Sequence, residues 1–302
     1  MKGITISAVV ISGFLLSLAD LAEAGDWGKN PKAVTYEETS LLKGDFEVTL
    51  GKTWLDGELG GTPDELDTYS GELQLGMDIG DHYFAQFDLL GEKTDARDGY
   101  QHGYAFAGHL MRRNSDAGGL GVFGGTLTTD QDNGTTDTSN RYFFGLEGQV
   151  YRQNATFFGQ VGYLDGTGGS DDDGEDSIRE AVFARGGVQY FLNEDLMIEA
   201  EVSGAFGKMD DDAPPLEDAE VIAWGVKAEK RLTNYLSGAI GYQGAEYFQD
   251  EENDRLNEHV AYLSFTVLFD QDTLQARSRK STSLDTPQIL RWSAQTGGPL
   301  ED

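Results

Sequence analysis

Long runs of alternating apolar and polar residues constrain this chain more than any other feature. In the run from Ile198 to Ser203, Ile, Ala and Val occupy one face while Glu, Glu and Ser occupy the other, and residues 222–229 and 261–269 alternate in the same way. Successive side chains of a β-strand point to opposite faces, whereas an amphipathic helix repeats its apolar residues every three or four positions. We therefore predict an all-β chain from residue 44 onward, with one apolar face on each strand.

The connections between these runs are of two alternating kinds. Short turns centre on Gly80-Asp81, Arg113-Asn114, Gln153-Asn154, Asn193-Glu194 and Thr233-Asn234, and the last four are spaced 40 residues apart. Longer polar loops, rich in residues that favour turns, fall near 55–66, 92–100, 129–140, 166–178, 208–218 and 249–257. The predicted strands between these connections are 44–54, 67–79, 83–91, 100–111, 117–128, 141–151, 155–165, 179–191, 195–207, 219–231, 236–248 and 258–269.

A repeat of 40 residues is also typical of β-propeller blades, which place four short strands in each repeat. Here two strands of about twelve residues fill the repeat. Strands that cross a membrane need roughly 9–11 residues. The strand length, the even count and the alternation of short turns with long loops predict a single closed antiparallel transmembrane β-barrel of about 12 strands.

Aromatic residues are found toward both ends of the predicted strands. Tyr83, Tyr190, Phe191 and Tyr235 lie beside short turns, whereas Trp54, Tyr69, Tyr100, Tyr142, Tyr163 and Tyr247 lie toward the longer loops. Two girdles of aromatic residues are expected where a barrel meets the membrane surfaces. Aromatic residues also favour strands in general, so both explanations remain open.

The composition excludes several classes of protein. The chain has no cysteine, which excludes disulfide scaffolds, thiolate metal sites, cysteine nucleophiles and an acylated N-terminal cysteine. A formal net charge of -31 disfavours nucleic acid as a partner and disfavours docking onto anionic lipid. The 40 glycines and only 6 prolines suit long strands, because proline removes a hydrogen bond from the ladder.

The N-terminus has the pattern of a signal peptide over residues 1–24. Lys2 precedes an uncharged apolar stretch over residues 4–19, and Ala22-Glu23-Ala24 supplies a small-residue cleavage site. The alternative is an uncleaved anchor helix, but 16 apolar residues fall short of the roughly 20 that span a bilayer. Residues 25–43 are then expected to form an N-terminal periplasmic lead-in.

These hairpins resemble those of Gram-negative outer-membrane β-barrel proteins of the porin-like kind. The resemblance rests on runs such as Val188-Gln189-Tyr190-Phe191-Leu192-Asn193-Glu194-Asp195-Leu196 and covers the predicted barrel, residues 44–269. Barrels of this kind usually end on an aromatic residue that the assembly machinery recognises, and Phe269 fits that role. Residues 270–302 depart from the pattern, and we expect a flexible periplasmic C-terminal tail there.

If the apolar faces point to lipid, the opposite faces line a lumen. The predicted lumen residues are Glu47, Glu72, Asp78, Asp88, Glu147, Arg185, Glu199, Glu201, Lys227 and Glu229. Eight acids against two bases predict an acidic wall that attracts cations and repels anions. The alternative is a closed barrel whose interior charges pair with one another, since twelve strands enclose only a narrow space.

Two other kinds of site are only weakly indicated. The run Asp130-Gln131-Asp132-Asn133-Gly134 begins like a calcium loop, but its glycine is one place early and the final glutamate is missing. A phospholipase-like site needs a histidine with a nearby serine, and neither His109 nor His259 has one at a suitable spacing. We therefore predict no enzyme activity, no resident metal and no cofactor.

The function predicted from the sequence is that of an outer-membrane porin-like protein for passive diffusion of small solutes, with a preference for cations. Outer-membrane lipid, lipopolysaccharide and the barrel assembly machinery are the expected partners, and the acidic loops could share divalent cations with lipopolysaccharide. Two alternatives remain: a closed structural or adhesive barrel that presents acidic surface loops, and a soluble, salt-adapted β-protein. The sequence does not specify the solute or the oligomeric state.

Overall fold

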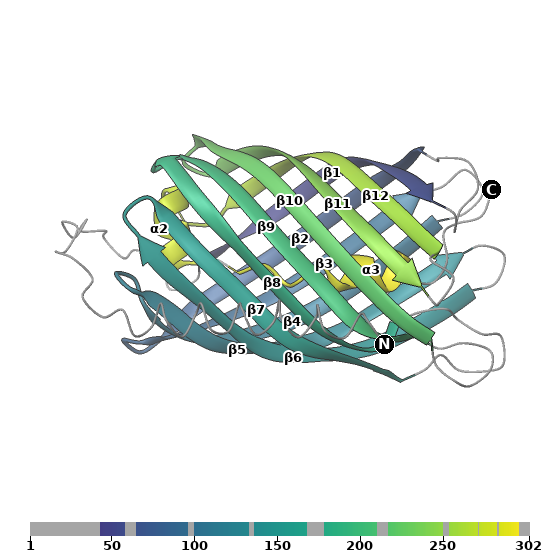
Figure 1. Ribbon diagram of the computed structural model, residues 1–302. Coiled ribbons are helices and arrows are strands. Elements are labelled where there is room, and N and C mark those ends of the chain that lie inside the picture. The colour runs from purple at the N-terminus through teal and green to yellow at the C-terminus, as the bar shows by residue number, and fades with distance from the viewer. Residues whose placement is uncertain are drawn as a thin grey trace. The chain divides into compact units, whose positions relative to one another are not determined.

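The chain forms a closed barrel of twelve antiparallel strands (Figure 1). The computed structural model describes residues 43–57, 65–95, 100–132, 136–167, 178–209, 217–249, 254–270, 272–282 and 284–295. Each strand pairs with the next along the chain, and β1 pairs with β12 to complete the ring. The strands are β1 (Lys43–Gly57), β2 (Glu65–Ile79), β3 (Tyr83–Asp95), β4 (Tyr100–Asn114), β5 (Gly118–Asp132), β6 (Thr136–Arg152), β7 (Ala155–Thr167), β8 (Ile178–Asn193), β9 (Leu196–Met209), β10 (Glu217–Thr233), β11 (Leu236–Gln249) and β12 (Asp254–Leu268).

The predicted fold class and strand count are therefore confirmed. The predicted signal peptide and all of the lead-in except Lys43 lie outside the described residues. So do most residues of the longer polar loops.

Alternation along each strand separates the two surfaces of the wall. On β9, Ile198 and Val202 are 39% and 58% exposed, whereas Glu199 and Ser203 are 6% and 7% exposed. The same arrangement gives the outer wall a belt of exposed Leu, Val, Ile and Phe side chains. A wall that exposes apolar side chains and buries polar ones suits a surface that faces lipid.

The strands extend further on the long-loop side than the alternation predicts. β1 continues to Gly57, and β12 begins at Asp254, four residues earlier than predicted. Their backbones remain paired to the end, with Gly57 opposite Leu256. On the other side four of the short turns lie within one residue of their predicted positions, whereas Arg113 and Asn114 belong to β4 and that turn follows at residues 115–117. Gly80 has a φ of 65°, which favours glycine because it lacks a Cβ atom.

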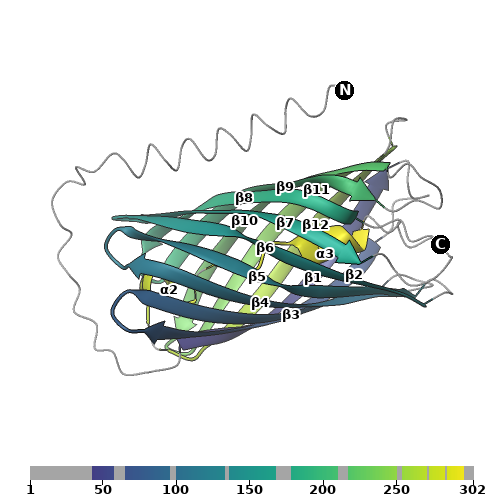
Figure 2. The same cartoon turned by 90° about the horizontal axis from the view of Figure 1, so that it is seen from below.

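Residues 272–282 and 284–295, which follow β12, do not form the flexible extension expected from the sequence. They contain two short helices, α2 (Leu274–Lys280) and α3 (Ile289–Gln295), which lie inside the barrel (Figures 1 and 2). Within the described part of the chain, no helix is long and apolar enough to cross a membrane. We call residues 272–282 and 284–295 the C-terminal segment.

The C-terminal segment runs along the lumen from one end of the barrel to the other. At the short-turn end, the backbone N–H of Gln275 donates to the carbonyl of Glu194, 3.1 Å away. Toward the long-loop end, the side chain of Leu290 lies over Gly103, near the start of β4. The segment is ordered because its side chains contact buried partners along the wall.

Candidate functional site in the barrel lumen

The structure places the ten predicted lumen residues on the inner side of the wall. Six of them line one cavity of about 140 Å³ in the middle of the barrel: Glu47, Glu72, Arg185, Glu199, Glu201 and Lys227. Asp88, Glu147 and Glu229 are buried but do not line it. Asp78 is separate from the others, because its side chain is 45% exposed and forms an ion pair with Lys43 at 2.7 Å, near the short turns.

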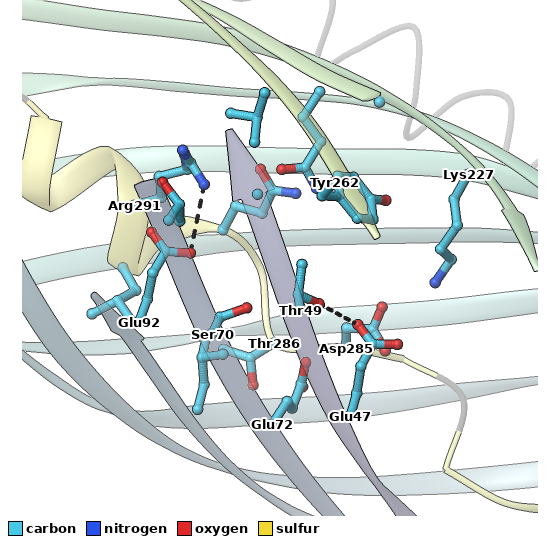
Figure 3. A pocket seen from close by; sticks show the side chains of 18 of the residues that line it. Glu47, Thr49, Ser70, Glu72, Glu92, Lys227, Tyr262, Asp285, Thr286 and Arg291 are labelled. Carbon is cyan, nitrogen blue, oxygen red and sulfur yellow. Dashed lines mark hydrogen bonds and ion pairs between the residues drawn. The ribbon is translucent and has the colours of Figure 1, made fainter. Parts of the chain in front are cut away.

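Charges of both signs meet around the cavity (Figure 3). The Arg185 guanidinium donates to one carboxylate oxygen of Glu201 at 2.8 Å and 2.5 Å. Lys227 is held more loosely, with its ammonium 3.9 Å from Glu199 and 4.0 Å from Glu229. The positive and negative charges on the cavity wall therefore partly compensate one another.

Glu47 and Glu72 face the same cavity from neighbouring strands, directly opposite each other in the β1–β2 ladder. Glu47 accepts hydrogen bonds from Thr49 and Thr266, and Glu72 accepts one from Gln74. These contacts come from neutral donors. A cation in the cavity would therefore meet two acidic side chains side by side.

The C-terminal segment supplies cations that the predicted lumen lacked. Arg291 donates to one oxygen of Glu258 at 2.9 Å and 2.5 Å, and it lies 3.6 Å from Glu92. Arg277 forms an ion pair with Asp45 at 2.6 Å and lies 3.8 Å from Glu229. The predicted excess of acids over bases came from the strands alone, and two arginines of the tail offset part of it.

The middle of the segment is held by a polar network. Gln86 donates to the carbonyl of Leu284 at 2.8 Å, and Arg185 donates to the carbonyl of Asp285 at 3.1 Å. The Asp285 carboxylate accepts a hydrogen bond from Gln74 at 3.0 Å. Burial favours the neutral form of Asp285, but the charges of Lys227, Arg185 and Arg277 outweigh burial, so its pKa lies below the usual value. Asp285 is therefore an ionised anchor at neutral pH.

The long-loop end of the lumen contains a buried apolar cluster, which was not predicted from the sequence. Ile289, Leu290 and Trp292 of α3 belong to one buried cluster with wall residues such as Leu55, Leu66, Leu127, Phe143, Leu164, Phe183, Val221 and Leu256. The expected acidic lining therefore does not extend along the whole lumen. The sequence does contain an indication of this apolar region, in consecutive apolar pairs such as Phe143-Phe144 and Val221-Ile222. Each pair places one apolar side chain on each face of the wall.

Packing and charge have different roles in holding the segment. Burying a large apolar side chain contributes about 1.5–3 kcal/mol, so the three side chains of α3 together provide most of the attraction. A buried ion pair contributes little net stability, because desolvation offsets its attraction. The ion pairs of Arg277 and Arg291 therefore fix the position of the segment more than they increase its affinity.

His109 lies in a buried group with two of the predicted lumen acids. One ring nitrogen is 2.8 Å from Glu147 and the other is 3.1 Å from Asp88, while the ring stacks on Phe123. Both nitrogens thus face carboxylates, and neither faces a serine hydroxyl that it could activate as a nucleophile. The arrangement supports a structural role for His109 in the wall.

Comparison with one solved channel structure supports the fold. The COG4313 outer membrane channel from Pseudomonas putida F1 matches with a TM-score of 0.60 and 12% identity, over 80% of this chain and 100% of that chain. The NanC porin matches with a TM-score of 0.47 and 12% identity, over 73% and 98% of the two chains. A FadL homologue of Pseudomonas aeruginosa matches with a TM-score of 0.44 and 9% identity, over 76% and 91%.

No family model matches this sequence, and no curated relative matches it. At these identities the likeness to the Pseudomonas putida channel extends to the fold alone. The chain has the fold of outer-membrane channels, and the function must be argued from the lumen.

Proposed function

We propose that this protein is an outer-membrane channel for passive diffusion of small solutes, that it prefers cations, and that its own C-terminal segment closes it at rest. The segment would leave the lumen, wholly or in part, when the channel opens. The short turns would face the periplasm and the longer loops the cell exterior, in contact with lipopolysaccharide. Cleavage after Ala24 and recognition of Phe269 by the assembly machinery belong to the same proposal.

One observation carries the proposal: the middle of the lumen is polar and charged where a solid barrel would need only apolar packing. The wall keeps Glu47, Glu72, Glu199, Glu201 and Lys227 around a cavity beside the segment. Buried charges destabilise a fold unless they are paired or serve a function. An aqueous path along these side chains gives them that function.

The proposed preference for cations follows from the change in lumen charge that would occur when the segment leaves. Arg277 and Arg291 would move away from Asp45, Glu229, Glu258 and Glu92. The open wall would then be more acidic than the closed one. In a narrow pore with low-dielectric walls, such charges concentrate cations.

The proposal is tested by the selectivity of single channels in planar bilayers under a KCl gradient. We expect a reversal potential that favours K⁺, and we expect the double variant Glu47→Gln and Glu72→Gln to shift it toward zero. A unit charge at 4 Å in water changes the local cation concentration by up to about fivefold. The matched control is Asp67→Asn, which removes an exposed carboxylate from β2. A pore that prefers anions would contradict the proposal.

The alternative function is a permanently closed structural or adhesive barrel that presents acidic loops. The observation that favours it is the filled lumen. The two functions differ in one result: a permanently closed barrel gives no conductance steps even when the C-terminal segment has been removed from an intact barrel.

A further inference from the structure

Residues 284–286 are held in the middle of the lumen in part through atoms that any peptide possesses. The carbonyl of Leu284 accepts from Gln86 at 2.8 Å, and the carbonyl of Asp285 accepts from Gln160 at 3.3 Å and from Arg185 at 3.1 Å. These donors come from strands β3, β7 and β8. The wall therefore recognises a stretch of main chain.

Side-chain contacts add selectivity to this recognition. The carboxylate of Asp285 accepts from Gln74 at 3.0 Å and lies 3.7 Å from the Arg185 guanidinium. Thr286 donates its hydroxyl hydrogen to Asp88 at 3.1 Å. Leu284 packs in a buried cluster with Met111 and Phe158 of the wall. An apolar residue followed by an acidic one fits this place best.

The wall donors are buried and are oriented by neighbouring carboxylates. Gln86 also donates to Asp88 at 2.8 Å, Gln160 to Glu147 at 3.3 Å, and Arg185 to Glu201 at 2.8 Å. Side chains whose orientation is fixed before a ligand arrives lose little entropy on binding. The site therefore does not depend on the covalent connection to β12.

The neighbouring carboxylates favour a peptide over a simple anion. Each donor lies beside Asp88, Glu147 or Glu201, so an inorganic anion that reached these donors would be repelled by those carboxylates. A main-chain carbonyl carries no net charge and accepts the same hydrogen bonds. Only the carboxylate of Asp285 is ionic, and it lies on the side of Arg185 and Gln74.

We propose that this part of the lumen is a binding site for short acidic peptides, and that Leu284-Asp285-Thr286 is its resident ligand. A free peptide with an apolar residue before an acidic one would compete with the segment and occupy the same donors. This inference rests on the proposed function, because a free ligand must reach the site through the pore.

The test uses the complete chain with a protease recognition sequence inserted after Gln271, cut only after the barrel has folded. In detergent, the cut segment is exchanged for a fluorescent copy of residues 272–295, and its binding is followed by anisotropy. The capped pentapeptide Leu-Asp-Thr-Pro-Gln, which copies residues 284–288, is then added as a competitor. The control competitor has asparagine in place of aspartate, since asparagine matches its shape without its charge.

We expect the acidic pentapeptide to displace the labelled copy and the asparagine peptide to need about tenfold more, because a charge-assisted hydrogen bond is lost. The wall variant Arg185→Gln should reduce this difference, because one of the cations that face the Asp285 carboxylate is then absent. Arg141→Gln should leave it unchanged, because Arg141 donates to Thr129, further toward the long loops. Equal competition by the two pentapeptides, or no competition by either, would overturn the inference.

The same cut protein separates this inference from the proposed function. Conductance in bilayers after the segment is released tests the channel, whereas anisotropy in detergent tests the site. A barrel that binds the acidic peptide but never conducts would contradict the channel and leave the site supported. A barrel that conducts but shows no peptide competition would contradict the site alone.

Discussion

A chain that ends at Asp270 is expected to conduct ions continuously in planar bilayers, whereas the full-length chain is expected to open only briefly. The change removes α2, α3 and the residues between them from the lumen, while the ladder between β1 and β12 already closes the ring by residue 268. Water then hydrates the carboxylates that Arg277 and Arg291 had paired with. Single-channel recording at equal protein density measures the open fraction of each chain.

Folding of the shortened chain must be established before its conductance is interpreted. Far-UV circular dichroism should retain the β-sheet signal, and the protein should still migrate as a compact species on an unheated gel. An intact shortened barrel that is as silent as the full-length protein would contradict closure by the C-terminal segment.

The substitution Arg291→Ala is expected to release the long-loop end of the C-terminal segment. It removes the guanidinium that contacts the carboxylates of Glu258, whose side chain is 2% exposed, and of the nearby Glu92. Breaking a buried ion pair by removing one partner destabilises by about 3–5 kcal/mol. Because the barrel ladder does not involve Arg291, we expect the loss to appear as release of the segment. The open fraction in bilayers should rise by about two orders of magnitude or more, in line with that free energy.

A second substitution separates loss of the charge pair from loss of packing. The double variant Glu258→Gln and Arg291→Met lacks the carboxylate of Glu258 but keeps the volume of both side chains. Its open fraction should therefore fall back toward that of the unmodified chain. Arg255→Ala is the control on the same strand, because Arg255 is exposed and lies over the ring of Phe248. An open fraction that is the same in Arg255→Ala and Arg291→Ala would show that the Arg291 pair does not hold the segment.

The barrel could be predicted from the sequence because its signals are local. The alternation around Ile198, Glu199 and Ala200 determines which side chains face inward, and glycine and asparagine mark the short turns. Inward-facing and outward-facing positions alternate along every strand. The side of the wall on which each of the ten predicted lumen residues lies could therefore be predicted without knowing which strands pair.

The C-terminal segment could not be predicted in this way because its partners are distant in the sequence. Arg277 contacts Asp45 and Arg291 contacts Glu258, while Asp285 is held by Gln74 and Arg185. Each helix has only 7 residues, too few for a clear helical period. A local indication was present in Arg277, Arg279 and Lys280, a basic group in a chain of net charge -31.

The central claim, that the C-terminal segment closes the lumen and must move for the channel to open, can be tested with a reversible crosslink. Ser278 of α2 donates to Thr156 of β7 at 3.0 Å, and both are buried. The chain has no cysteine of its own, so Ser278→Cys with Thr156→Cys introduces a unique pair whose sulfur atoms would replace two oxygen atoms 3.0 Å apart. Including Arg291→Ala ensures that the reduced protein opens often.

We predict that the oxidised triple variant shows no openings, that reductant added to the bilayer restores them, and that renewed oxidation abolishes them. Each single-cysteine variant in the Arg291→Ala background should conduct regardless of redox state. Equal conductance of the oxidised and reduced triple variant would contradict the claim that movement of the C-terminal segment opens the channel.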